Sequence, residues 1–141
     1  MKPRSAFTII EMTVVVALAS AIFAIALPKA STFIDRIEVR GAVTEIESMF
    51  SLARHAAIAR GSQVTLDIDA MRGTLSIRSG ADLIRSREVG SAHRVILSTN
   101  RTSITYSPIG VGYGAANLSL IVSRNRVVDT VVVSRLGRVR H

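Results

Sequence analysis

Residues 6–28 read AFTIIEMTVVVALASAIFAIALP, and this stretch decides how the whole chain is organised. Between Phe7 and Leu27 the only charged side chain is that of Glu11. As an α-helix these 21 residues would be about 31 Å long, which is enough to cross the hydrocarbon core of a bilayer. Two basic residues, Lys2 and Arg4, precede the stretch and would hold the N-terminus on the cytoplasmic side.

Two ordinary explanations of this apolar stretch do not account for Glu11. One is a secretory signal peptide with Ala24-Ile25-Ala26 as its small-residue cleavage site. The other is a plain membrane anchor. Both leave a carboxylate unpaired within the apolar run, and an Asp at the centre of a membrane helix costs roughly 2.5–3.5 kcal/mol. The run is also longer than the roughly 7–15 apolar residues of a signal-peptide core.

After Pro28 the pattern changes from uniformly apolar to amphipathic. Apolar residues recur mostly at three- and four-residue spacing, which predicts a helix with one buried face over residues 29–60. Gly41 lies within this segment and weakens it locally, and Gly61 is expected to end it. The apolar stripe is Phe33, Ile34, Ile37, Val43, Ile46, Met49, Phe50, Ala53 and Ala57.

Beyond Gly61 the apolar residues alternate with polar ones, which is typical of β-strands. Residues 64–68 and 75–77 flank the turn Met71-Arg72-Gly73 and predict a hairpin. A Pro- and Gly-containing loop is expected over 107–117. Further strands are predicted at 83–89, 94–98, 102–106, 118–122 and 127–134. The predicted fold class is α+β, with one long helix packed on an antiparallel sheet.

The charge is strongly basic and is concentrated toward the C-terminus. The formal net charge is +8, and from Gly90 onward seven arginines face a single acid, Asp129. In an extended segment Arg138 and Arg140 point to the same side about 6.6–7 Å apart, close to the phosphate spacing along one DNA strand. The tail could therefore bind duplex DNA, or it could close the sheet and keep its edge soluble. Further arginines that could extend such a patch are Arg135, Arg126 and Arg124.

No set of residues indicates catalysis, a cofactor or a metal. The chain contains no Cys, and its three histidines have no metal-ligand spacing. Asp67 and Asp69 would share one face of a strand, which is more consistent with a solvated face than with a cation site. The glycines of residues 110–114 lack the strand-to-helix setting of a phosphate-binding loop. We therefore expect a protein that is not an enzyme.

The segment Ala6-Phe7-Thr8-Ile9-Ile10-Glu11 resembles the prepilin processing motif of type IV pilins and type II secretion pseudopilins. The rest of the chain resembles the GspH/FimT group of minor pseudopilins within that superfamily. The resemblance covers nearly the whole chain, and its later parts are residues 52–58, 64–66, 104–110 and 131–140.

The resemblance implies a role for each part of the N-terminus. A prepilin peptidase would cut between Ala6 and Phe7 and methylate the new terminus; the family usually has Gly where this chain has Ala6. The carboxylate of Glu11 would pair with the terminal amine of Phe7 in a neighbouring subunit, which makes burial of the charge tolerable. Pro28 falls where many members of the family kink this helix.

The resemblance also implies four regions and two candidate functions. The regions are a cleaved leader (1–6), a membrane and assembly helix (7–28), its amphipathic continuation (29–60), and a β-rich periplasmic or fibre-surface domain (61–141). The expected protein is a minor subunit of a secretion pseudopilus or type IV pilus. It would be held in the inner membrane by one helix and would later be built into a fibre with other pilins. The alternative is a DNA receptor, because in some members the tail that matches Gly137, Arg138 and Arg140 contributes to DNA capture.

Overall fold

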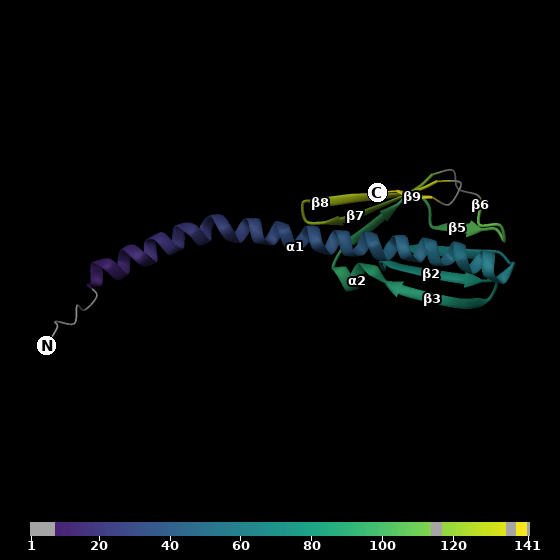
Figure 1. Ribbon diagram of the computed structural model, residues 1–141, viewed down its shortest axis with the longest axis horizontal. Helices are drawn as coiled ribbons and strands as arrows, with labels where there is room; N and C mark the ends of the chain where they lie inside the picture. The colour runs from purple at the N-terminus through teal and green to yellow at the C-terminus, as the bar shows by residue number, and fades with distance from the viewer. Residues whose placement is uncertain (1–7, 114–116, 135–137, 141) are drawn as a thin grey trace. The chain divides into compact units, whose positions relative to one another are not determined.

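The computed structural model describes residues 8–113, 117–134 and 138–140. One helix, α1 (Ile9–Arg60), is followed by a β-rich region. The chain divides into two compact units, Met1–Ile34 and Asp35–His141, so α1 contributes to both. Figure 1 shows the elements.

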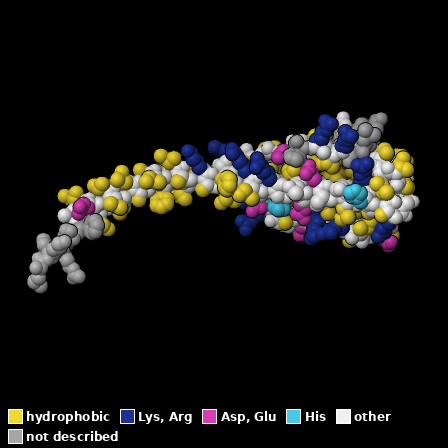
Figure 2. Space-filling model, in the orientation of Figure 1, with side chains coloured by type: hydrophobic (Ala, Val, Ile, Leu, Met, Phe, Trp, Pro, Cys, Tyr) yellow, Lys and Arg dark blue, Asp and Glu magenta, His cyan; other side chains and the backbone are white. Residues whose placement is uncertain are grey.

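The first unit consists, in its described part, of the N-terminal half of α1. Its large apolar side chains are exposed, and Figure 2 shows hydrophobic atoms over most of this surface. The helix is long and apolar enough to cross a membrane, with a mean hydropathy of 2.4 over its most apolar window. The predicted helix continues through Pro28 without interruption, and Ser31 and Thr32 donate hydrogen bonds from their hydroxyls to the Pro28 carbonyl.

The second unit packs the remainder of α1 against two antiparallel sheets rather than one (Figure 1). In the described residues the first sheet has the strand order β3-β2-β1-β5-β6 and the second has the order β4-β7-β8-β9. The first sheet comprises β1 (Val64–Asp69), β2 (Thr74–Ser79), β3 (Asp82–Glu88), β5 (Ser103–Tyr106) and β6 (Gly112–Tyr113). The second comprises β4 (Ile96–Thr99), β7 (Leu118–Arg124), β8 (Val127–Val133) and β9 (Val139–Arg140).

Alternating strand residues build a common aliphatic core with α1. In β1 the side chains of Val64, Leu66 and Ile68 are buried, as the alternation predicts. From α1, Ile46 and Phe50 enter the same cluster of buried residues. The predicted hairpin is confirmed as β1 and β2, paired from Thr65–Arg78 to Asp69–Thr74.

A short helix, α2 (Val89–His93), connects the two sheets, and the sequence patterns did not predict it. It replaces the end of the strand predicted at 83–89, and the strand predicted at 94–98 begins later, at Ile96. Gly90 of α2 crosses the β1–β2 turn, where its N–H donates to the carbonyl of Gly73 at 2.9 Å. A β-carbon on Gly73 would lie 2.6 Å from the Gly90 Cα, so this close crossing requires glycine.

Candidate functional site

The N-terminus of α1 is capped by a reciprocal pair of side chains. The Thr8 N–H donates to Glu11 Oε2 at 2.8 Å, and the Thr8 hydroxyl donates to the same oxygen at 3.0 Å. In return the Glu11 N–H donates to Thr8 Oγ1 at 3.2 Å. This arrangement is a capping box. Its Thr-x-x-Glu pattern is present in the sequence, but no cap was predicted from it. Glu11 therefore has a partner within its own chain as well as its expected role in assembly.

The roles expected for the other N-terminal residues, and for part of the C-terminal tail, remain predictions. Ala6 and Phe7, between which cleavage is expected, lie outside the described residues, as do Arg135 and Gly137 of the C-terminal tail. Pro28 lies inside α1.

The C-terminal arginines line a hollow on the second unit. Arg138, Val139 and Arg140 form one wall, and the exposed side of α1 forms the other, enclosing about 430 Å³. The α1 residues are Glu47, Ser51, Arg54 and His55. The wall is held by β9, in which Val139 pairs with Val133 and Arg140 pairs with Val132 of β8. The structure thus adds Arg54 and His55 to the two predicted arginines.

Two polar side-chain atoms, one of them on a residue that lines the hollow, are buried without a hydrogen-bond partner among the described residues. They are Nε of Arg54 and the hydroxyl of Tyr106. Burial raises the pKa of Tyr106 to about 12, and the nearby positive charge of Arg54 opposes that rise. The hydroxyl is therefore neutral at pH 7, and the guanidinium of Arg54 contributes positive charge to the hollow.

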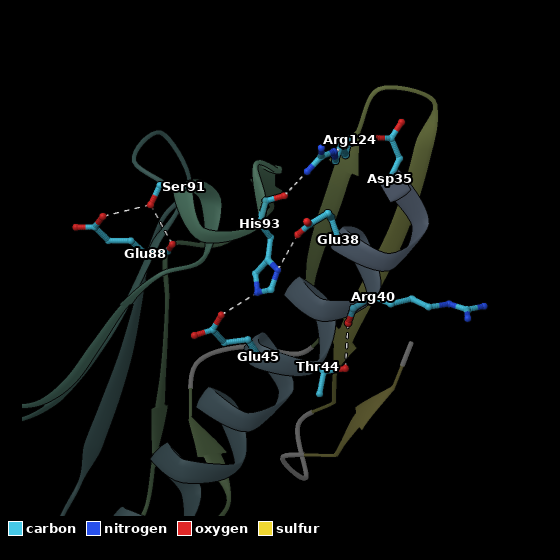
Figure 3. Close-up of polar contacts among 9 residues, drawn as sticks. All are labelled: Asp35, Glu38, Arg40, Thr44, Glu45, Glu88, Ser91, His93 and Arg124. Atoms are coloured by element: carbon cyan, nitrogen blue, oxygen red, sulfur yellow. Dashed lines mark hydrogen bonds and ion pairs between the residues drawn. The ribbon is translucent and has the colours of Figure 1, made fainter. Parts of the chain in front are cut away.

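Arg124 does not belong to that hollow. Its Nε donates to Asp35 Oδ1 at 2.8 Å, and its Nη1 donates to the carbonyl oxygen of His93 at 2.8 Å (Figure 3). Asn125 Nδ2 donates to the other Asp35 oxygen at 2.9 Å. We call Asp35, His93, Arg124 and Asn125 the Asp35 junction, because they join α1, α2, the end of β7 and the turn that follows it. Arg126, in that turn, is exposed and does not line the hollow either.

Asp35 is the buried acid of the junction, with 8% of its surface exposed. The hydrogen bond from Asn125 lowers the pKa of its carboxyl, and Arg124 lowers it further against an opposing contribution from burial. Sequence reasoning missed the pair because Asp35 and Arg124 are 89 residues apart in the chain.

His93 makes a second connection between α2 and α1. Its Nδ1 lies 3.2 Å from Glu38 Oε2 and its Nε2 lies 3.1 Å from Glu45 Oε2 (Figure 3). Arg87 of β3 approaches Glu45 as well, at 3.6 Å. No group of three or more metal-ligating side chains occurs within residues 8–113, 117–134 and 138–140.

Comparison with known structures places this arrangement among the pilin-type α+β proteins. The type IV minor pilin FimU of Pseudomonas aeruginosa matches with a TM-score of 0.65 and 20% identity, over 77% of this chain and 90% of that one. The minor pseudopilin EpsH of the Vibrio cholerae type 2 secretion system matches with a TM-score of 0.57 and 11% identity, over 73% and 94%. These likenesses show the shared fold.

A family model described as Type II transport protein GspH matches residues 42–137. The chain belongs to this GspH family of minor pilins and pseudopilins, whose members are structural subunits rather than enzymes. A comparison with curated protein sequences finds no significant match.

Proposed function

We propose that the chain is made as a membrane-anchored precursor and becomes a minor subunit of a type II secretion pseudopilus or type IV pilus. In this proposal prepilin peptidase cuts between Ala6 and Phe7, residues 7–28 hold the precursor in the inner membrane, and the β-rich unit faces the periplasm. The observation that carries the proposal is the order of parts: two basic residues near the N-terminus, an apolar helix with one acid near its start, and a region that matches the GspH family model.

The capping box allows a sharp test of the role of Glu11. Glu11→Gln keeps an oxygen that can accept both Thr8 hydrogen bonds but removes the charge, whereas Glu11→Ala removes both. We expect both variants to be depleted from sheared fibres, measured by immunoblot against whole cells. Thr8→Val is the matched control, because it weakens the cap and retains the carboxylate.

Normal entry of Glu11→Gln into fibres, with loss only in Glu11→Ala and Thr8→Val, would show that capping and not charge matters. Mass spectrometry of the mature N-terminus tests processing separately. A chain that begins at Phe7 supports the proposal, and one that begins at Leu27 contradicts it.

The hollow at β9 favours one further candidate function, the capture of duplex DNA. Arg54, Arg138 and Arg140 place three guanidinium groups around one concave surface, with His55 beside them and Glu47 as its only acid among the lining residues. Such a surface fits phosphates without reading bases. Binding by the detergent-solubilised full chain should weaken steeply with salt.

Arg138→Gln with Arg140→Gln should reduce the slope of log affinity against log salt by about 1–2, since each lost phosphate contact removes roughly one. Arg60→Gln with Arg85→Gln removes the same charge from two exposed positions outside the hollow and is the matched control. If both double variants reduce the slope equally, DNA binding depends on net charge and not on the hollow.

A further inference from the structure

The Asp35 junction brings three exposed arginines together from distant parts of the sequence. Hydrogen bonds join Asp35 to Arg124 and Asn125, and join Arg124 to the carbonyl of His93. The residue that follows each of Asp35, His93 and Asn125 is an exposed arginine: Arg36, Arg94 and Arg126. Because consecutive Cα atoms are only about 3.8 Å apart, the three arginines start from one small area.

The acids of this area are already engaged, which leaves an excess of positive charge. Asp35 is occupied by Arg124 and Asn125, and Glu38 lies against His93. Over the described part of the chain, Arg36, Arg94 and Arg126 form no ion pair, whereas Arg72, Arg78 and Arg87 each approach an acid within 4 Å. Arg40, one turn beyond Arg36, is also exposed, and Figure 3 shows its side chain extending away from Glu38 and Glu45. We call Arg36, Arg40, Arg94 and Arg126 the basic cluster.

Chain connectivity keeps the basic cluster close to the apolar part of α1. Asp35 follows Leu27 by eight residues, a distance of about 12 Å in a helix. Even a fully extended chain of that length would reach no more than about 29 Å. Whatever the angle between the two units, Asp35 stays within that distance of Leu27, and the cluster can reach the surface of a bilayer that holds residues 7–27. This step rests on the membrane-anchored precursor of the proposed function.

We propose that the basic cluster binds the anionic headgroups of the bilayer in which the precursor is anchored. Guanidinium groups form paired hydrogen bonds with phosphate oxygens, and unpaired arginines near a negatively charged surface are attracted to it. The contact would hold the β-rich unit against the membrane surface until the subunit leaves for the fibre. It would be sensitive to salt, because the arginines are exposed.

The absence of cysteine makes a single-label experiment possible. The full chain with Ala92→Cys, an exposed position in α2 beside His93, carries a fluorophore and is reconstituted in vesicles whose headgroups carry a quencher. One set of vesicles is phosphatidylcholine and the other contains about 30% phosphatidylglycerol, a common anionic lipid. Each basic residue near an anionic surface favours contact by about fivefold. We therefore expect the ratio of surface-bound to free domain, calculated from the quenched fraction, to be at least about fivefold higher in the anionic vesicles, with the difference lost in about 0.5 M salt.

The variant Arg94→Gln with Arg126→Gln should abolish most of that difference. Arg60→Gln with Arg85→Gln removes equal charge from exposed positions outside the cluster and should retain it. Neither pair includes a residue of the Asp35 junction, and a melting curve of each variant in detergent is the check that it folds.

The failures of the two proposals are distinguishable. If the chain does not float with vesicles of either composition, the membrane anchor itself is wrong. If it floats with both and quenching is equal, the anchor stands and headgroup binding is overturned. Headgroup binding is also overturned if both double variants lose the quenching difference equally, because the attraction to the anionic vesicles would then depend on net charge and not on the cluster. Headgroup binding is likewise overturned if Arg94→Gln with Arg126→Gln weakens binding of a duplex DNA probe and leaves quenching unchanged.

Discussion

The imidazole ring of His93 lies against Gly41 of α1, so closely that a β-carbon at position 41 would come within 2.9 Å of His93 Cε1. Glu38 and Glu45, two turns apart on α1, hold the ring at its two nitrogens. Gly41 lies between them on the helix. The glycine that appears in the sequence as a weak point of α1 is the place where α2 docks.

This contact predicts that Gly41→Ala changes the free energy of unfolding in opposite directions when the His93 ring is present and when it has been removed. Replacing glycine by alanine inside a helix stabilises it by about 1 kcal/mol when nothing is displaced. Gly41→Ala should instead lower the free energy of unfolding, because the new methyl group pushes the ring away from both carboxylates. In a His93→Ala background the same substitution should raise it by about 1 kcal/mol. Chemical denaturation of the four proteins measures this, and one sign in both backgrounds would contradict the docking role.

The Asp35 junction predicts loss of stability in acid. Its hydrogen bond from Asn125, with the added effect of Arg124, holds the pKa of Asp35 below its value of about 3.9 in the unfolded chain. The stabilisation is therefore complete above about pH 4 and is lost as the pH falls through the folded-state value. Asp35→Asn should be less stable than the unmodified chain at pH 7, and this gap should close toward pH 2.

Thermal melting across that pH range provides the measurement. Asp82→Asn, at an exposed position at the start of β3, is the control and should show no comparable gap at pH 7. A gap for Asp35→Asn that stays constant from pH 7 to pH 2 would rule out this account.

The buried hydroxyl of Tyr106 predicts a neutral or stabilising substitution. It has no hydrogen-bond partner among the described residues, and an unsatisfied buried polar group costs about 1–3 kcal/mol. Tyr106→Phe keeps the ring in the core and removes the hydroxyl, so the free energy of unfolding should stay the same or rise by up to about 1 kcal/mol. Tyr113→Phe, at an exposed position, is the control. A loss of more than about 1 kcal/mol for Tyr106→Phe would reveal a partner of that hydroxyl.

The crossing of Gly73 and Gly90 predicts that glycine-to-alanine substitutions at two otherwise similar turns lower the free energy of unfolding by different amounts. Gly73 and Gly80 both have positive φ, of 65° and 59°, but a β-carbon on Gly80 would meet no atom within 4 Å. Gly80→Ala should cost about 1–2 kcal/mol through backbone strain alone. Gly73→Ala should cost about 1–3 kcal/mol more, because its β-carbon would collide with the backbone of Gly90. Chemical denaturation measures both losses. Equal losses for Gly73→Ala and Gly80→Ala would contradict the prediction and would mean that α2 moves away from the turn without loss of stability.

Local patterns were sufficient to predict the long helix and the first hairpin. Both depend on contacts between residues close in sequence, and the apolar periods of 3.6 and 2 report those directly. The division into two sheets could not be read in this way. The partner of β1 on its second side is β5, where Leu66 pairs with Ile104, and periodicity carries no information about which strands pair across such distances.

The candidate sites show the same limit. Arg138 and Arg140 were predicted together because they are two residues apart, and both line the hollow. Arg124 was grouped with them by charge alone, yet its partner Asp35 lies on α1. The capping of Glu11 by Thr8 is different, since its pattern is local and could have been predicted.

The pairing of β1 with β5 also has a consequence for the order in which the unit assembles. The strands β1, β2 and β3 form two successive hairpins, whose ends meet after closure of short loops. The joining of β5 must bring together residues nearly 40 positions apart, as Leu66 and Ile104 are, and long-range pairings of this kind slow folding. We expect β1, β2 and β3 to form a three-stranded meander first. One edge of β1 would then stay unpaired until β5 joins it. During that interval the open side of β1 is a place where two newly made chains could pair with each other by mistake.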